Sequence, residues 1–286
     1  MKNAELHCHS HYSDGMSSPA ELVKKAKQKK IKYLALTDHN SVKGVKEAIK
    51  AGKKYGINII PAVEIRCHEC EVLGYFVDIK NRELNKQLAL NRKQVEDIVK
   101  DWCRKLKKAG VPVDFTEIHN KFPKAKGNIN DFYVLYLMHL KGWGTINQVR
   151  IKLRRLMKKH NFKFSRIKEM PAVKAIRLIR KAGGVPVLAH PWLGGMEILK
   201  KLVRAGLKGI ELSNGDNAPF RPAIYTRKIK AAARRYKLII TTGSDYHGDK
   251  LAKMMTQGNH YLGSRLCDKK VVEQLARFAG IYAFIY

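Results

Sequence analysis

The feature that most constrains the fold is a short apolar run followed within a few residues by a histidine or a carboxylate, repeated along the chain. Five such runs end before His7 and His9, Asp38 and His39, Glu64, His190, and Asp245 and His247. Segments with helical periodicity separate most of them. Parallel strands that alternate with helices place their carboxyl ends on one face, so these side chains are expected to converge there.

The first eighty residues read as alternating strands and helices. We expect strands at 4–6, 32–37, 58–63 and 71–77, and helices at 18–30 and 42–55. Ser18, Pro19 and Glu21 form a capping box with proline at the first helical position, and Gly56 is typical of a helix end. This pattern predicts an α/β domain.

The pattern changes between residues 81 and 169. Helices are expected at 83–109, 131–141 and 146–160, and the stretch carries 22 Lys and Arg against 8 Asp and Glu. The alternation then resumes, with strands at 185–189, 209–212, 238–243 and 258–262 and helices at 171–182, 196–205, 222–236 and 268–279. We therefore divide the chain into a first barrel part (1–80), a basic helical insert (81–169) and a second barrel part (170–286).

The charge balance favours anionic partners. Fifty-seven Lys and Arg oppose 24 Asp and Glu, which gives a formal net charge of +33. Such a field concentrates anions and accelerates their capture, so phosphate-bearing molecules, including nucleic acid, are expected partners. A generally basic proteome or a high-salt cytoplasm is the competing explanation, because charge alone fixes no function.

The sequence argues for a cytoplasmic protein that does not enter a membrane. No apolar run approaches the roughly 20 residues that span a bilayer, and residues 1–15 lack the apolar core of a signal peptide. Five cysteines are an odd number in a chain of this size, so no disulfide framework is expected. Cys67 and Cys70 resemble half a zinc site, but no second pair completes it.

The strand-end residues are individually weak signals and jointly a strong one for a multinuclear metal site. Imidazoles combined with carboxylates suit Zn, Mn or Fe, and Mg less well. A bridging carboxylate such as Glu64 lets two ions lie about 3.5–4 Å apart. Ions so placed convert water to hydroxide and neutralise phosphoryl oxygens, which is machinery for hydrolysing a charged ester.

Five motifs carry a family resemblance. They are His7-Cys8-His9-Ser10 with Ser13-Asp14-Gly15, Leu36-Thr37-Asp38-His39-Asn40, Pro61-Ala62-Val63-Glu64-Ile65, Leu188-Ala189-His190-Pro191, and Gly243-Ser244-Asp245-Tyr246-His247-Gly248. In this order they resemble the PHP (polymerase and histidinol phosphatase) family of metal-dependent phosphoesterases. The resemblance extends from residue 7 to residue 248.

The resemblance implies a fold and a set of ligands. The implied fold is a distorted (β/α)7 barrel, here with an inserted helical subdomain, that holds two or three divalent ions. By family analogy, the first ion is bound by His7, His9, Glu64 and Asp245; the second by Glu64 and His190 with a further ligand near Glu71; and the third by Asp14, His39 and His247. The residues expected to take part in catalysis are His7, His9, Glu64, His190 and Asp245.

The insert resembles that of a branch whose members dephosphorylate nucleotides. That branch includes nucleoside 3′,5′-bisphosphate phosphatases and 5′–3′ exoribonucleases that act on short RNA. The implied activity is hydrolysis of a nucleotide bisphosphate or a 5′-phosphorylated short RNA by attack of a metal-bridged hydroxide.

The chain departs from that branch at two places. It has Glu71 where the branch usually has His, and Asn128-Ile129-Asn130 where the branch usually has an Arg-x-His pair. The candidate substrate-binding residues are Lys126, Asn128, Asn130 and Arg150.

Two alternative functions stay open. One is a histidinol-phosphatase-like enzyme for a small monoester, which would need no broad basic surface. The other is a non-catalytic nucleic-acid-binding module, for which Tyr133, Tyr136 and Trp143 could stack bases among basic helices. The spacing of Phe132, Leu135, Tyr136 and His139 instead favours a helix face packed in a core.

Overall fold

A single eight-stranded sheet forms the centre of the molecule. The structure is a computed structural model that describes residues 2–125, 128–162, 169–191, 195–212, 222–254 and 260–282. The strands follow one another in space in the order β7-β6-β5-β4-β3-β2-β1-β8. Their bounds are β1 Lys2–Cys8, β2 Tyr33–Leu36, β3 Asn58–Arg66, β4 Glu71–Tyr75, β5 Val185–Leu188, β6 Gly209–Glu211, β7 Ile239–Thr241 and β8 Cys267–Asp268.

The chain beyond β7 nearly closes this sheet into a barrel. Cys8 and Tyr246 form a parallel bridge, and the backbone N–H of His9 donates to the carbonyl of Tyr246 at 2.8 Å. The approach requires a glycine at position 243, because a Cβ there would lie 2.3 Å from the Cβ of His7. The α/β barrel predicted from the sequence is thus confirmed, with β8 paired antiparallel to β1 as a short extra strand.

One strand runs against the others. β1, β2 and β3 are parallel neighbours, as are β5, β6 and β7, whereas β4 is antiparallel to both β3 and β5. Only four residues join β3 to β4, which is too short for a parallel crossover and therefore makes a hairpin. The hairpin pairs Glu71 with Arg66, so the first residue of β4 lies at the rim where β3 ends.

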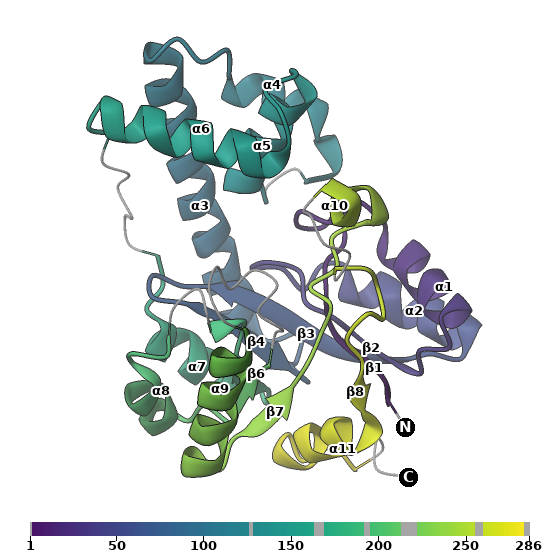
Figure 1. Cartoon of the computed structure of the whole chain (residues 1–286). Helices are drawn as coiled ribbons and strands as arrows, with labels where there is room; N and C mark the ends of the chain where they lie inside the picture. The colour runs from purple at the N-terminus through teal and green to yellow at the C-terminus, as the bar shows by residue number, and fades with distance from the viewer. Residues whose placement is uncertain are drawn as a thin grey trace.

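Helices cover the outside of the barrel (Figure 1). They are α1 Pro19–Gln28, α2 Val45–Tyr55, α7 Ala172–Lys181, α8 Leu199–Ala205, α9 Pro222–Tyr236 and α11 Lys269–Phe278. A further helix, α10 Asp249–Met254, lies above the sheet towards the insert (Figure 1). The expected capping box of α1 is present, and Gly56 ends α2 in the left-handed conformation at φ 68°. Three local expectations differ: α8 begins at Leu199, α10 was not predicted, and the described part of 258–262 is not a strand.

Four α-helices and a short 3-10 helix follow β4. They are α3 Arg82–Lys108, α4 Phe115–Lys121, η1 Pro123–Ala125, α5 Asp131–Leu140 and α6 Ile146–Lys159. α3 runs away from the sheet and carries the others above it (Figure 1). Leu84 and Leu88 at its start belong to the core around the barrel, and Val99 and Leu106 further on belong to a separate core with α5 and α6.

The aromatic residues of α5 belong to that second core. Tyr133 and Tyr136 are each 5% exposed, and Trp143 packs half-buried against the same cluster. Of the four residues for which the helical spacing predicted burial, Leu135 and Tyr136 are buried, whereas Phe132 and His139 are half-buried. Leu251 of α10 joins the cluster, which ties the insert to the segment after β7. Within the described ranges, no helix is both long and apolar enough to span a bilayer.

Candidate metal centre

The end of β1 delivers two histidines to the rim of the barrel. His7 and His9 flank Cys8, and both imidazoles are fully buried. The chain then turns sharply, and a Cβ at position 15 would lie 2.2 Å from the carbonyl oxygen of His9, so only glycine fits there. This turn holds Asp14 beside His9, with 3.9 Å between Oδ1 and Nδ1.

The first group of convergent side chains consists of His7, His9, Glu64 and Asp245, whose ligand atoms all lie within 4.8 Å of one another. His9 Nε2 lies 3.2 Å from Asp245 Oδ1 and 3.3 Å from Glu64 Oε2. Asp245 adopts a left-handed backbone at φ 51°, where the chain turns after β7. These four residues are the set that family analogy gave for the first ion.

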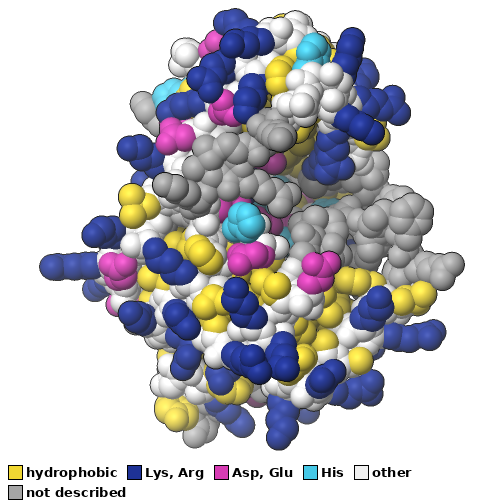
Figure 2. All heavy atoms as spheres, turned by 90° about the vertical axis from the view of Figure 1, so that its left-hand side faces the viewer, with side chains coloured by type: hydrophobic (Ala, Val, Ile, Leu, Met, Phe, Trp, Pro, Cys, Tyr) yellow, Lys and Arg dark blue, Asp and Glu magenta, His cyan; other side chains and the backbone are white. Residues whose placement is uncertain are grey.

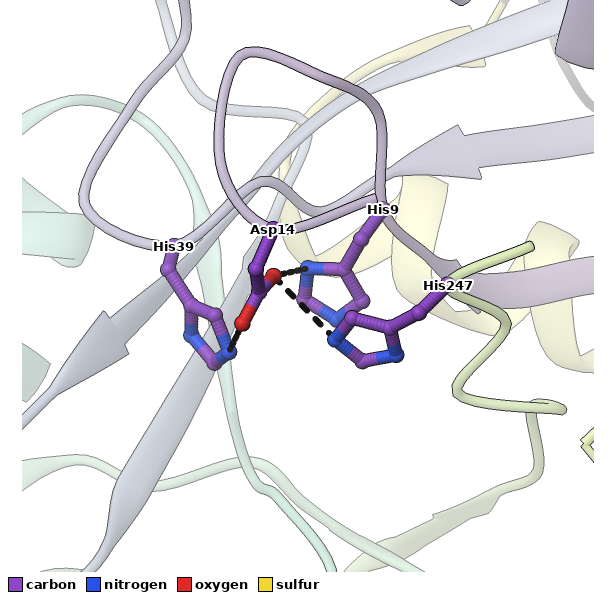
Figure 3. Close-up of side chains that lie close together, drawn as sticks. All are labelled: His9, Asp14, His39 and His247. Atoms are coloured by element: carbon purple, nitrogen blue, oxygen red, sulfur yellow. Dashed lines mark ion pairs between the residues drawn. The ribbon is translucent and has the colours of Figure 1, made fainter. Parts of the chain in front are cut away.

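The second group consists of His9, Asp14, His39 and His247 (Figure 3). Asp14 lies between the imidazoles, with Oδ1 at 3.2 Å from His247 Nε2 and Oδ2 at 3.7 Å from His39 Nε2. The rings of His9 and His247 stack at 4.1 Å. The structure thus brings together the predicted third set and adds His9 to it.

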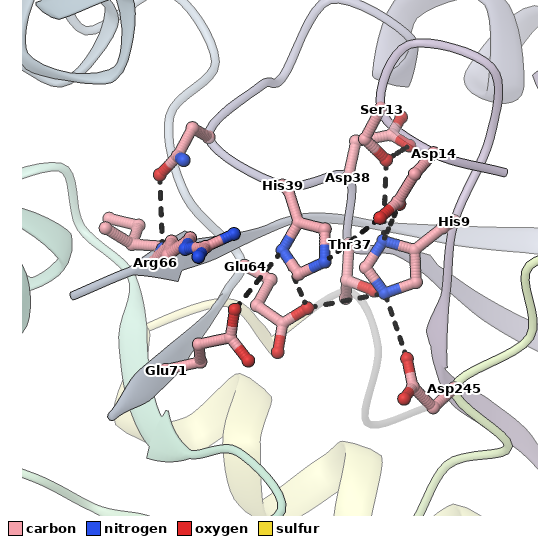
Figure 4. A network of polar contacts seen from close by, with 12 residues as sticks. His9, Ser13, Asp14, Thr37, Asp38, His39, Glu64, Arg66, Glu71 and Asp245 are labelled. Carbon is pink, nitrogen blue, oxygen red and sulfur yellow. Dashed lines mark hydrogen bonds and ion pairs between the residues drawn. The ribbon is translucent and has the colours of Figure 1, made fainter. Parts of the chain in front are cut away.

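The third group consists of His39, Glu64 and Glu71 (Figure 4). His190 reaches the same carboxylates, because its Nε2 lies 3.0 Å from Glu64 Oε1 and 3.5 Å from Glu71 Oε2. His39 Nδ1 lies 3.2 Å from the other oxygen of Glu64. The predicted set of Glu64, His190 and Glu71 is therefore in one place, with His39 as an additional neighbour.

The pKa values show how strongly these groups interact. Burial acts to raise the pKa of Glu64, but the charges of the nearby His7 and His39 more than offset this effect. The pKa of Glu64 therefore lies well below its usual range, and the carboxyl group is ionised. The pKa of Asp245 is likewise lowered, because His7 and His247 outweigh burial. Burial and the charge of His247 lower the pKa of His9 to about 3, which keeps this imidazole neutral and able to bind a cation.

The donor set fits divalent cations. His9 Nε2, His39 Nδ1 and Asp14 Oδ1 are buried atoms that have no hydrogen-bond partner among the described residues. Four carboxylates, those of Asp14, Glu64, Glu71 and Asp245, lie within this one cluster of imidazoles. Burying that much negative charge is costly unless cations balance it. Nitrogen and oxygen donors together suit borderline divalent ions.

Sequence reasoning missed the groups that orient the ligands. Glu211, in β6, accepts from His7 Nδ1 at 2.9 Å and from the backbone N–H of His190 at 2.9 Å. Such a carboxylate fixes the ring so that the opposite nitrogen faces the ion. The available signal was an acidic residue inside an otherwise apolar predicted strand, 209–212. Its side chain is buried, as is that of Glu5 in β1, which accepts from three backbone N–H groups.

Asp38 is a further carboxylate at the rim, and its hydrogen-bond donors are Ser10 and Ser13. Its oxygens accept from the backbone N–H and hydroxyl of Ser10 and from the hydroxyl of Ser13, at 2.7 to 2.8 Å (Figure 4). It therefore holds the turn that carries Asp14. Burial raises the pKa of Asp38 to about 6, although these bonds favour the ionised form.

The candidate substrate-binding residues occupy different environments. Lys126 lies outside the described residues. The Asn128 amide donates at 2.7 Å to the carbonyl oxygens of Tyr12 and His39, and the Asn130 amide donates at 2.7 Å to Asp14 Oδ2. These amides hold the turns that carry metal-ligand candidates. Arg150 is half-buried on α6, and burial together with the charge of Arg154 lowers its pKa.

Two other arginines border the site. Arg66, at the end of β3, pairs with Asp131 and with Glu169, the latter at 3.2 Å. The guanidinium of Arg92, on α3, donates to the carbonyl oxygen of Asn40 next to His39. Figure 2 shows His and acidic side chains where the barrel meets the insert, and Lys and Arg scattered over the rest of that face.

The match to known proteins agrees with this geometry. The model of the PHP domain matches residues 5–125, the segment that contains His7, His9, Asp14, His39 and Glu64. Over these residues the chain matches the PHP family.

Three curated proteins are similar to this chain over most of their length. A 5′–3′ exoribonuclease of Haemophilus influenzae is 29% identical in sequence, and the alignment covers 86% of this chain and 90% of the exoribonuclease. A phosphoribosyl 1,2-cyclic phosphate 1,2-diphosphodiesterase of Eggerthella lenta is 29% identical, and the alignment covers 85% of this chain and 94% of the diphosphodiesterase. A 3′,5′-nucleoside bisphosphate phosphatase of Chromobacterium violaceum is 26% identical, and the alignment covers 86% of this chain and 88% of the phosphatase.

A solved structure shares the fold of this chain. The protein comes from Bifidobacterium adolescentis and is described as a metal-dependent phosphoesterase. The two structures superpose with a TM-score of 0.82, and the superposition covers 97% of this chain and 96% of the Bifidobacterium chain. The two sequences are 22% identical. Barrel and helical insert therefore occur together in a second protein.

Proposed function

We propose that this protein is a metal-dependent phosphoric ester hydrolase that acts on phosphorylated nucleotides. The observation that carries the proposal is the convergence of the three groups of imidazoles and carboxylates at one rim of the barrel. Their residues come from distant parts of the sequence, and packing alone gives no reason for them to meet. The match of residues 5–125 to the PHP domain and the relatives' named activities on phosphate esters support the same class of reaction.

The chain's own residues hold and orient the reacting groups. Bound divalent ions would supply Lewis acidity towards phosphoryl oxygens and activate water for attack. His7, His9, Glu64 and Asp245 would hold one ion, Glu64, Glu71 and His190 a second, and Asp14, His39 and His247 a third. Glu211 fixes the ring of His7, and Asp38 fixes the turn before Asp14. A site assembled in advance costs little reorganisation during the reaction.

The donors favour particular metals. Five imidazoles and four carboxylates favour Mn, Zn or Fe, in two or three positions, over Mg. Glu71 makes the second group richer in oxygen than a histidine would. We therefore propose Mn as the first ion to test.

The proposed substrate is a nucleoside 3′,5′-bisphosphate or a 5′-phosphorylated short RNA. One relative is named as a 3′,5′-nucleoside bisphosphate phosphatase, and another is named as a 5′–3′ exoribonuclease. The net charge of +33 and the arginines beside the rim suit a ligand with several phosphates. The relative named for a phosphoribosyl cyclic phosphate makes a base-free sugar phosphate the second candidate.

Two further proposals concern the whole chain. Residues 81–169 form the inserted helical subdomain between barrel parts 1–80 and 170–286, supported by the separate core of α4, α5 and α6. The protein works in a reducing compartment, the cytoplasm, supported by five buried cysteines that are all free thiols.

The decisive experiment is a phosphate-release screen on protein with defined metal content. Protein stripped by a chelator and reloaded with Mn, Zn, Fe or Mg is offered adenosine 3′,5′-bisphosphate, 5′-phosphorylated RNA, phosphoribosyl 1,2-cyclic phosphate and histidinol phosphate. We expect turnover of the nucleotide substrates with Mn and none after stripping. If every metal leaves all four substrates intact, the proposed function is wrong. Preferential turnover of histidinol phosphate would favour a small-monoester phosphatase.

A further inference from the structure

A pocket of about 260 Å³ lies beside the second metal group, between the barrel and the insert. The turn after β1 forms one wall, and α4, η1 and the start of α5 form the other. The lining residues are His11, Asp14, Gly15, Met16, Lys121, Phe122, Pro123, Ala125, Phe132 and Tyr133. Asn128, Asn130 and Arg150, the predicted substrate-binding residues that the structure describes, do not line it.

The wall from the insert is aromatic and held in place. The ring of Phe132 stacks on Tyr136 at 5.7 Å, and the ring of Phe122 lies 4.9 Å from Tyr133 and 5.4 Å from Tyr136. The hydroxyl of Tyr133 donates to the carbonyl of Ser13, which fixes this wall to the opposite one. Phe122 and Phe132 are only half-buried, so the cluster leaves part of each ring uncovered.

The polar groups of the pocket lie at its edges. Asp14 belongs to the group with His9, His39 and His247, so the pocket opens directly onto candidate metal ligands. Lys121 contributes an exposed cation from α4. A molecule that fills the pocket therefore needs a flat apolar part against the phenylalanines and an anionic part at the cations. A nucleotide has both parts, whereas a sugar phosphate has only the second.

We propose that this pocket binds the nucleobase of the substrate, and this inference rests on the function proposed above. Bases stack on aromatic rings largely without regard to their identity, because every base has a π face. The pocket would thus select nucleotides over base-free phosphate esters while accepting different bases. It would place the base on the side of Asp14 and the reacting phosphate over the shared carboxylates.

The test compares substrates with and without a base in matched variants. Phe132→Leu and Phe122→Leu keep an apolar side chain and remove the ring. Phe115→Leu is the control, because Phe115 packs against the same core but does not line the pocket. Each Mn-loaded protein is assayed with adenosine 3′,5′-bisphosphate and with its analogue in which hydrogen replaces the base. A second readout is the fluorescence of 2-aminopurine riboside 3′,5′-bisphosphate titrated into metal-free protein.

We expect the ratio of kcat/KM between the two substrates to fall about tenfold in the Phe132 and Phe122 variants and to stay constant in Phe115→Leu. Wild-type protein should quench the 2-aminopurine emission, and the two pocket variants should quench it less. A ratio that does not move, together with equal quenching in all proteins, overturns the pocket assignment. If no protein hydrolyses either substrate, the proposed function fails, and the quenching alone then decides whether the pocket binds a base.

Discussion

A single carboxylate links two of the strand ends on which the metal centre depends. Asp245 approaches His9 at 3.2 Å and His7 at 3.4 Å, and its pKa is lowered because the charges of His7 and His247 outweigh burial. Replacing one anionic oxygen by an amide removes a charged ligand while keeping the side-chain volume. The consequence should therefore appear in metal content and turnover rather than in folding.

We expect Asp245→Asn to lower phosphate release by more than 100-fold, since loss of even a group that orients a ligand costs about 10–100-fold. Metal content by mass spectrometry should fall by about one ion per chain. Asp249→Asn is the matched control, because Asp249 is half-exposed and pairs with Lys25 at 2.6 Å outside the cluster. Full activity in Asp245→Asn would show that this carboxylate holds no essential ion.

Asn130 performs two separable tasks with one amide group. Its oxygen caps α5 by accepting from the backbone N–H of Phe132 at 3.1 Å, and its nitrogen donates to Asp14 at 2.7 Å. Serine is an equally good capping residue but is too short to reach Asp14. Asn130→Ser therefore isolates the second task.

In Asn130→Ser we expect the weakest-bound ion to lose affinity by about 10–100-fold, as happens when a group that orients a ligand is removed. The measurement is a calorimetric titration of stripped protein with Mn. Asn81→Ser is the control, because the side-chain oxygen of Asn81 also caps a helix, α3, by accepting from the backbone N–H of Leu84. Equal titrations of both variants would mean that Asn130 only caps its helix.

The residues that could be predicted from the sequence are those with a fixed place relative to a strand. His7, His9, Glu64, His190 and Asp245 follow apolar runs, and parallel strands bring such positions to one rim. Glu211 and Asn130 follow no such rule, since each acts through a partner more than a hundred residues away. The Glu211 contact depends on how β6 lies relative to β1, and the Asn130 contact depends on how the insert packs on the barrel. Local sequence patterns determine neither.

At the scale of elements, α3 connects the two cores. Its first turns place Leu84 and Leu88 in the core around the barrel, and its last turns place Cys103 and Leu106 in the core of the insert. A boundary at residue 81 therefore marks where the insert begins in the sequence. The packing changes later, inside the helix. We expect the two parts to unfold together, because a continuous helix transmits the loss of either core.

Leu88 and Leu90 give a matched pair on this helix. Leu88 is 1% exposed and Leu90 is 48% exposed. Leu88→Ala should lower the free energy of unfolding by about 2–5 kcal/mol, through lost burial and a residual cavity. Leu90→Ala should change it by less than about 0.5 kcal/mol. Urea unfolding followed by circular dichroism makes the comparison, and equal effects would contradict the placement of α3.

The order of helices and strands was largely predictable, because capping signals and periodicity act within a few residues. The direction of β4 was not, since it depends on the length of the connection and on pairing with β5, which lies about 110 residues later. The two-residue strand β8 and the six-residue helix α10 are too short to produce a periodic signal. Their positions are determined by contacts with β1 and with the insert.

At the scale of the whole molecule, the net charge of +33 opposes the negative character of the metal centre. The four carboxylates act at short range on bound cations, whereas the 57 basic residues act at longer range on an approaching anion. Long-range attraction accelerates association and is screened over about 10 Å at 0.1 M salt. Salt should therefore weaken substrate capture more than it weakens the coordination of buried ions.

For adenosine 3′,5′-bisphosphate we expect kcat/KM to fall on the order of tenfold between 50 and 500 mM KCl, with kcat nearly constant, because steering affects encounter rather than chemistry. Adenosine 3′-monophosphate carries fewer charges, so its kcat/KM should fall less steeply with the KCl concentration, which makes it the internal control. A 5′-phosphorylated RNA should show the steepest slope if several of its phosphates contact Lys and Arg, since each contact releases counterions. Identical slopes for all three substrates would mean that the basic surface plays no part in capture and reflects only the composition of the chain.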